Sequence, residues 1–361
     1  MKRLFLTILA AALGLAASAQ TIHPEWDLRF QGTFINDEFD ISDQILAPSG
    51  TLGAARISPY IGLVFADNHR VKAGLDLIKD FGVGDEKPFF EPALWYQYDS
   101  DGGFRFAGGV FPYALLGGFY STAIWSDENR FYDAHVDGFL VSWQGEHSLY
   151  EICLDWFGKY GENRREQFLV MSYGKCAITS WFSLNWEGMM HHYASSDAVK
   201  GVVDDHLIHP YLQFEFSPLV PLDRLELSLG GMIGYQWDRR FDERYFPKGA
   251  DAIVDIRKWG FGVRNQFYYG QSQAPYFHAV DDAGDEYGTD LYIRSSWWQI
   301  RTDGQPGLYD RLDAYWMKSL NDWVDIGFHA VFHFDHLGLL GTQQMLQASV
   351  NLEGLRFRRR R

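Results

Sequence analysis

The sequence predicts an all-β protein, a transmembrane antiparallel up-and-down β-barrel of about sixteen strands, with roughly 14 to 18 compatible with the pattern. Three observations predict it: segments in which apolar and polar residues alternate, no later apolar run long enough to cross a bilayer as a helix, and an aromatic content of 17%. Alternation gives a strand one apolar and one polar face. Tyr and Trp collect where a barrel wall meets the two membrane interfaces.

The segment 323–335 shows this alternation most completely. Its apolar side chains fall at even positions, namely Val324, Ile326, Phe328, Ala330, Phe332 and Phe334. Its polar positions are odd, namely Asp325, Gly327, His329, His333 and Asp335. A soluble sandwich also makes such strands, but it covers the apolar face with a second sheet. Because the pattern recurs along the whole chain behind an export signal, we expect the apolar face to contact lipid.

The two ends of the chain differ from the rest. Residues 1–19 are expected to be a cleavable signal peptide, because Lys2 and Arg3 precede a short apolar run that leads to Ala17-Ser18-Ala19. The barrel is expected to cover residues 20–357. Four arginines, Arg358 to Arg361, form a basic C-terminal tail that could bind anionic lipid headgroups, although a solvated tail is the simpler interpretation.

Sixteen candidate strands follow one another, each rich in β-forming or alternating residues and bounded by turn-forming or charged residues. They are 26–34, 57–65, 71–77, 90–98, 104–111, 137–143, 149–157, 167–173, 178–190, 208–216, 225–236, 252–257, 261–269, 308–317, 323–334 and 345–357. Tight turns join them within hairpins, at 67–69, 99–103, 145–147, 174–176 and 258–260 among others. Loops of roughly 8 to 40 residues join one hairpin to the next, so we expect the short turns and both termini on the periplasmic side.

These features resemble a Gram-negative outer-membrane β-barrel of general porin-like type, with no specific family of known substrate. In the last segment, Leu346, Ala348, Val350 and Leu352 alternate on the way to Phe357, which resembles the terminal strand read by the outer-membrane insertion machinery. The arginines after Phe357 depart from that pattern. The resemblance implies an outer-membrane location, contact with outer-membrane lipid and the insertion machinery as a partner during biogenesis. A homo-oligomer is compatible with it.

If the apolar faces point outward, the polar side chains line a lumen. The candidates for lining a pore carry both signs of charge: Arg29, Arg56, Lys72, Asp76, Arg105, Glu151, Asp155, Glu187, Glu215, Arg264, Arg311, Asp313, Asp325, His329 and His333. In a water-filled pore such groups set the field and the ion selectivity. The alternative for each of them is an ion pair across neighbouring strands that stabilises the wall. The long segments 112–134 and 270–307 could fold inward and narrow the barrel, or remain surface loops.

Charge and motif content weigh against several other classes of protein. The formal net charge of −15 makes nucleic acid an improbable partner. Cys153 and Cys176 allow one disulfide bridge at most. His329 and His333 lie four residues apart on a strand, about 13 Å, which is too far to chelate one metal without other strands. The sequence therefore predicts no metal and no cofactor.

The function predicted from the sequence is a channel for passive diffusion of small hydrophilic solutes. The alternatives are a plugged barrel that acts as a surface binding or structural protein, an outer-membrane hydrolase, and lastly a secreted soluble β protein. A hydrolase of this architecture needs a Ser, Asp or Glu within hydrogen-bond reach of a His near an interface or loop rim. The sequence contains no GxSxG and no HExxH. We therefore expect that the chain is not an enzyme and has no catalytic residues.

Overall fold

The computed structural model describes residues 22–39, 50–84, 87–281, 284–292 and 304–356. The expected signal peptide at 1–19 and the basic tail at 358–361 lie outside these ranges and remain predictions. No helix among the described residues is long and apolar enough to cross a bilayer.

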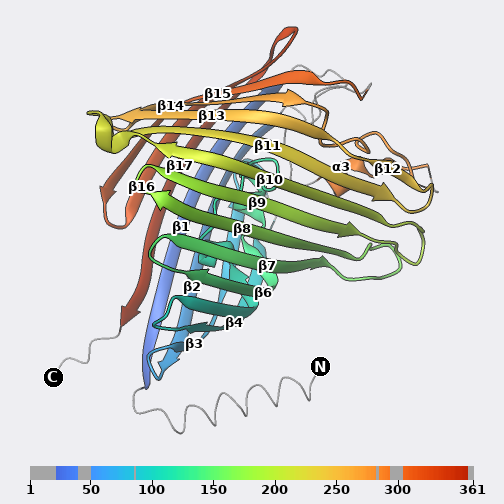
Figure 1. Ribbon diagram of the computed structural model, residues 1–361. Coiled ribbons are helices and arrows are strands. Elements are labelled where there is room, and N and C mark those ends of the chain that lie inside the picture. Colours follow the sequence, from blue (N-terminus) through green and yellow to red (C-terminus); the bar gives the residue numbers. More distant parts are fainter. Residues whose placement is uncertain (1–21, 40–49, 85–86, 282–283, 293–303, 357–361) are drawn as a thin grey trace, which may run out of the picture.

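Sixteen long antiparallel strands form the wall (Figure 1). They are β1 (Ile22–Phe39), β2 (Gly50–Phe65), β3 (His69–Asp80), β4 (Phe89–Asp99), β5 (Phe104–Pro112), β6 (His135–Gln144), β7 (Ser148–Gly158), β8 (Gln167–Thr179), β9 (Phe182–Tyr193), β10 (Val203–Glu215), β11 (Arg224–Asp238), β13 (Lys248–Lys258), β14 (Phe261–Gly270), β15 (Gly307–Asn321), β16 (Val324–Asp335) and β17 (Gly338–Arg356). A further strand, β12 (Glu243–Tyr245), pairs only with the end of β11 and belongs to a long loop.

The sheet closes on itself, because β1 pairs with β17 as well as with β2. Each of the sixteen strands therefore has two neighbours, and no row of backbone N–H and C=O groups is left at a sheet edge in the membrane. The start of β1 and the end of β17 lie at the same end of the barrel as most short turns. The two-residue turn 336–337 lies at the opposite end, which the sequence did not predict. The predicted all-β fold, the closed barrel and the count of sixteen strands are confirmed.

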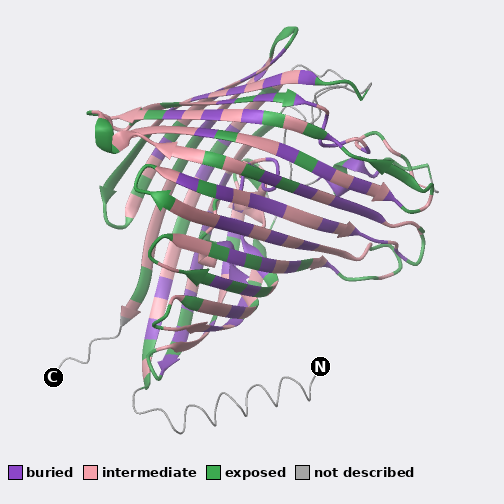
Figure 2. Ribbon diagram, in the orientation of Figure 1, coloured by how far each residue is buried: buried purple, intermediate pink, exposed green. Residues whose placement is uncertain are grey.

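The two faces of the wall alternate as predicted, which Figure 2 shows as bands of buried and exposed residues along each strand. On β16, Phe328 points outward and is 45% exposed, whereas His333 and Asp335 point inward and are buried. The two cysteines lie on opposite faces and are not bridged: Cys153 is buried inside, and Cys176 contacts the outward-facing Tyr150.

Several predicted boundaries are wrong; the strand expected at 57–65, for example, begins at Gly50. The turn expected at 174–176 lies at 180–181, because β8 continues to Thr179. Gly174 is not a turn residue but makes room for the ring of Trp186 on β9, since a Cβ there would lie 2.1 Å from Trp186 Cη2. The last strand begins at Gly338 rather than at 345, so only two residues separate β16 from β17. Residues 342–344, near the start of β17, pair with the polar residues 36–38 of β1. Both faces of the sheet are polar there, so the sequence shows no alternation.

The largest cluster of buried apolar side chains lies inside the barrel. It combines inner-wall residues such as Leu140 and Met171 with two segments that fold inward from the long loops, 113–134 and 271–292. The first contains the short helices η1 (Tyr113–Leu115) and α2 (Asp127–Tyr132), and the second contains α3 (Gly288–Leu291). A fourth short helix, η2 (Ser217–Leu219), lies in the turn between β10 and β11.

Candidate functional site

The segment 113–134, called here the inward segment, is anchored to the inner wall by carboxylates. The backbone N–H groups of Gly117 and Gly118 donate to the two oxygens of Glu151 on β7, at 2.8 and 2.9 Å. The hydroxyl of Tyr120 donates to the same carboxylate at 2.9 Å. Burial, followed by the charge of Glu151, raises the pKa of Tyr120 far above its usual value, so this phenol stays a donor. Ser121 N–H donates to Glu187 on β9 at 2.6 Å.

The other side of the inward segment is tied to the opposite wall. Arg56 on β2 donates to the backbone carbonyl of Phe131 at 2.7 Å and lies over its ring. Tyr132 donates to Asp80 on β3 at 2.6 Å. Between these anchors α2 begins at Ser126, whose hydroxyl accepts from Asn129 N–H at 3.2 Å as an N-cap. The inward segment therefore crosses the lumen between β7–β9 and β2–β3.

A second inward portion, 271–292, covers the half of the wall nearer the long loops at β9–β11. The hydroxyl of Tyr292 donates to Gln236 at 2.5 Å, and that of Tyr287 donates to Asp238 at 2.9 Å. Nδ1 of His191 lies 3.0 Å from the backbone carbonyl oxygen of Leu291. Both long segments named from the sequence thus reach into the barrel within the residues that the structure describes.

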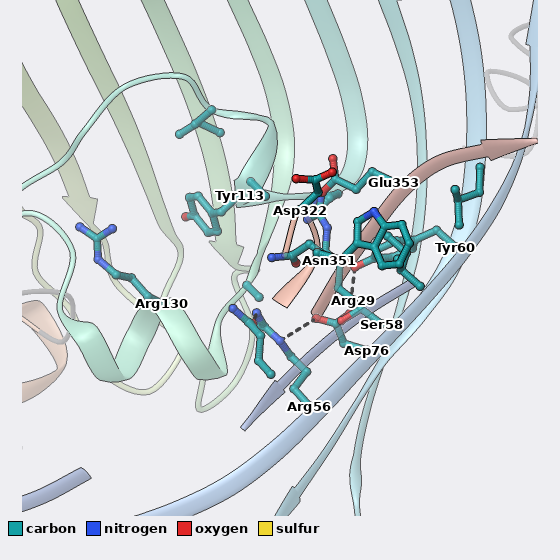
Figure 3. A pocket seen from close by; sticks show the side chains of 18 of the residues that line it. Arg29, Arg56, Ser58, Tyr60, Asp76, Tyr113, Arg130, Asp322, Asn351 and Glu353 are labelled. Carbon is teal, nitrogen blue, oxygen red and sulfur yellow. Dashed lines mark hydrogen bonds and ion pairs between the residues drawn. The ribbon is translucent and has the colours of Figure 1, made fainter. Parts of the chain in front are cut away.

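Two cavities adjoin the inward segment. The larger, of about 730 Å³, is bounded by side chains of the barrel seam and by the inward segment, and its charged lining is Arg29, Arg56, Asp76, Arg130, Asp322 and Glu353 (Figure 3). The smaller, of about 360 Å³, includes Asp127, Phe131 and Asp325. Gln31 and Arg130 line both cavities. The larger volume is of the size that small-molecule sites have.

Four of the predicted pore-lining residues border these cavities: Arg29, Arg56, Asp76 and Asp325. Several of the others are held by ion pairs within the wall itself, as the alternative interpretation expected. Lys72 pairs with Glu25 at 2.8 Å and Asp27 at 2.7 Å. Arg105 pairs with Asp99 at 2.6 Å, and His329 pairs with Asp313 at 3.0 Å.

Glu151, Asp155 and Glu187 face inward but are occupied. Glu151 and Glu187 hold the inward segment, and Asp155 accepts from the hydroxyl of Tyr113. Glu187 also lies 2.8 Å from Nδ1 of His209, whose Nε2 is 2.8 Å from Asp251. This buried row of acid, imidazole and acid joins β9, β10 and β13 and stabilises the wall.

One of the predicted positions needs correction. His333 does not line water: it is buried, packs edge-on against Phe39 and hydrogen-bonds the hydroxyl of Tyr309 at 2.5 Å. Glu215 and Asp325 lie at the rim of the barrel, since they lie where β10 ends and β16 begins. Parity along a strand gives the face of a residue, but not its depth or what covers it.

Sequence reasoning missed Arg130 and Phe119, which belong to the inward segment. Arg130 donates to the backbone carbonyls of Trp125 at 3.2 Å and of Tyr120. Its guanidinium lies over the ring of Trp125 at 4.8 Å and near that of Phe119 at 6.0 Å. A lone arginine inside a long aromatic stretch was the available signal. Among the described residues, no three His, Cys, Asp or Glu side chains converge to hold a metal ion.

A second missed arrangement lies on the outer face of the wall. Nδ1 of His192, near the end of β9 at the long loops, is 2.7 Å from a carboxylate oxygen of Asp204 on β10. Asp204 is also held by Arg239 at 2.5 Å. The ring of His192 stacks on that of Phe168, with 4.9 Å between the ring centres. Trp237 on β11 is the register partner of Asp204. The aromatic neighbours place this pair in the belt where a barrel meets the membrane interface.

The comparisons with known proteins divide into a family match and structural likenesses. The model of a family described as "Lipid A 3'-O-deacylase-type" matches residues 23–199, just under half of the chain. That description is of an enzyme family, so the expectation that the chain is not an enzyme is wrong. No curated protein matches the chain.

Solved structures resemble the whole fold at low sequence identity. A loop L8 deletion mutant of OmpT, an outer membrane protein of Vibrio cholerae, matches with a TM-score of 0.55 at 7% identity, covering 91% of this chain and 99% of that one. OpdO of Pseudomonas aeruginosa matches with a TM-score of 0.52 at 9% identity, covering 91% and 97%. OccK11 (OpdR) of the same organism gives 0.50 at 8% identity, covering 91% and 96%. At this identity the likeness shows the fold, a closed antiparallel β-barrel of the kind that these solved proteins have.

Proposed function

We propose that this barrel is a channel for passive diffusion of small hydrophilic solutes across the outer membrane. The observation that carries the proposal is the inward segment: it is tethered at both sides of the lumen, yet it leaves two cavities that share Arg130. A segment held in this way narrows a passage without needing to move. Charged and polar side chains around it would keep water in the passage and set its selectivity.

The alternative for the lumen is a plugged barrel that serves as a surface binding or structural protein. The depth of the two inward portions supports this alternative, because Tyr120, Ile124 and Tyr292 are as buried as core residues of a soluble protein. A plug and a constriction differ in one measurable respect, which is whether ions cross.

Planar-bilayer recordings of the refolded protein test the channel. The channel predicts stepwise conductance and swelling of proteoliposomes in small uncharged sugars. A barrel that is folded, as judged by heat-modifiable gel mobility, but gives neither signal would refute the channel and leave the plugged barrel.

A second function, an outer-membrane acyl-ester hydrolase, is favoured by the family match and by the His192–Asp204 pair. His192 lies within the matched residues 23–199. Asp204 would hold the imidazole through Nδ1 and leave Nε2 to act as a general base, as in a catalytic triad. No serine, threonine or cysteine among the described residues hydrogen-bonds His192, so water would be the attacking group. This site and the lumen lie on opposite faces of the wall, so the two functions are compatible.

Release of fatty acid from acylated outer-membrane glycolipid, followed by mass spectrometry, tests the hydrolase. His192→Ala should abolish release, and Asp204→Asn should reduce it strongly because the imidazole loses its orientation. His206→Ala is the matched control, since His206 lies on the same outer face and touches the ring of Tyr235 rather than a carboxylate. No release by the wild type, or equal loss in the His206 variant, would contradict the assignment.

A further inference from the structure

Arg264 is an arginine in the lumen that forms no ion pair with a described carboxylate. Arg264 on β14 lies between Asp255 and Asp313 in the register of the sheet, but both carboxylates are engaged elsewhere. Asp255 accepts from the hydroxyl of Tyr315 at 2.6 Å, and Asp313 pairs with His329 at 3.0 Å. Among the described residues, no carboxylate comes within ion-pair distance of Arg264.

The contact that Arg264 does make is with the inward segment. Its guanidinium lies 5.0 Å from the centre of the Phe119 ring, and Arg130 lies 6.0 Å from the same ring. Phe119 is 49% exposed, so this ring is open to the lumen. A cation over an aromatic face is stabilised by roughly 0.5–1 kcal/mol when exposed, much less than a buried charge loses by leaving water.

Arg130 is the second cation without an acidic partner at this place. Its hydrogen bonds go to backbone carbonyls of its own segment. Burial lowers the pKa of its guanidinium; the negative charges of Asp127 and Glu187 oppose this shift and the positive charge of Arg264 adds to it. An arginine remains charged in any case. Arg311 on β15 is nearby and only loosely paired, at 3.6 Å from Asp127 and 3.7 Å from Asp313.

The carboxylates around these arginines accept their hydrogen bonds from other groups. Glu151 accepts three from the inward segment, and Glu187 is shared between Ser121 N–H and His209. These carboxylates keep their charge and act on the arginines from a distance, as Asp127 and Glu187 do on Arg130, but none accepts from the N–H donors of Arg130 or Arg264 among the described residues. A solute that brings a negative charge would offset the desolvation of two or three guanidinium groups.

We infer that the constriction selects small anionic solutes, which bind through a carboxylate or phosphate group to Arg130 and Arg264 beside the ring of Phe119. The inference rests on the proposed channel and names its substrate class. Guanidinium groups suit such anions because their N–H donors match two acceptor oxygens at once.

Reversal potentials in planar bilayers test the inference, with potassium chloride and then potassium acetate as the permeant salts under a concentration gradient. The wild type should favour the anion in both salts. Arg264→Gln and Arg130→Gln should each reduce the anion-to-cation permeability ratio several-fold, and the double variant should abolish the preference. Arg244→Gln is the matched control, because Arg244 is paired with Asp242 on the extracellular loop, outside the lumen.

The outcomes separate the inference from the channel itself. The anion site would be overturned, and the channel would stand, if the wild type gave stepwise conductance with a preference for cations. The same holds if Arg264→Gln and Arg130→Gln left the anion-to-cation permeability ratio unchanged. A folded wild type without conductance would overturn the channel, and the inference with it. Gel mobility of each variant before and after heating confirms that the comparison is between folded barrels.

Discussion

Glu151 is the residue on which the position of the inward segment most depends. Its carboxylate accepts from Gly117 N–H, Gly118 N–H and the hydroxyl of Tyr120 at 2.8–2.9 Å. Hydrogen bonds to a charged group each contribute about 1.5–3 kcal/mol, so removing the charge while keeping the shape should loosen the segment without unfolding the wall.

We therefore expect that Glu151→Gln speeds hydrogen–deuterium exchange in peptides from 113–134 by at least tenfold, equivalent to about 1.4 kcal/mol. Peptides from the neighbouring strands should exchange as in the wild type. Glu146→Gln, on an exposed periplasmic turn, is the control and should change nothing. Equal exchange of the inward segment in both variants would show that other contacts hold it.

The sequence allowed faces to be assigned, because side chains alternate along a strand with a period of two. Lys72, Asp76, Glu151 and Arg264 all point inward as predicted. The sequence did not allow the contact partners of these side chains to be assigned, because the partners depend on strand register and on loops that lack any periodicity. Arg130 lies in such a loop, and its place beside Arg264 depends on a fold of the loop that no local pattern encodes.

At the scale of elements, the inward segment approaches the wall closely enough to require glycine. A Cβ on Gly118 would lie 2.5 Å from Glu151 Oε1 and 2.5 Å from Tyr173 Cγ. Gly118→Ala must therefore displace the segment, at a cost of about 1–3 kcal/mol. We expect accelerated exchange and noisier single-channel current in this variant. Gly102→Ala is the control, because the nearest contact of its added Cβ would be Ser100 Oγ at 3.8 Å. Equal exchange rates and equal current noise in the two variants would disprove the close approach of Gly118 to the wall.

The seam between the first and last strands is the element that makes the sheet a barrel. Phe34 on β1 and Leu346 on β17 are register partners on the outer face. In the Cys153→Ser, Cys176→Ser background, Phe34→Cys with Leu346→Cys should form an intramolecular disulfide, visible as a gel shift reversed by reductant. Phe34→Cys with Phe328→Cys should not, since β17 separates these two positions. Bridging in the second pair alone would contradict the closure.

The whole molecule is a lipid-facing wall around an interior that has a core of its own. The wall follows from dyad alternation and could be predicted, because every strand must pair on both sides in a membrane. The filling of the lumen could not be predicted, because the sequences of 113–134 and 271–292 are typical of polar and aromatic loops. These segments become buried only once the barrel has closed. The arginines at the constriction are likewise brought together by the whole fold, because Arg264 of β14 and Arg130 of α2 meet only at the ring of Phe119.

The central claim, a conducting barrel narrowed by its inward segment, is tested most directly by removing that segment. Tyr113 N–H donates to the carbonyl of Ala134 at 2.9 Å, so a short glycine–serine linker can replace residues 114–133 without straining β5 or β6. Single-channel recordings should show a wild-type conductance that rises several-fold in the deletion variant, with the anion preference lost. A folded deletion variant whose conductance equals that of the wild type, or a pair of barrels that do not conduct at all, would contradict the account.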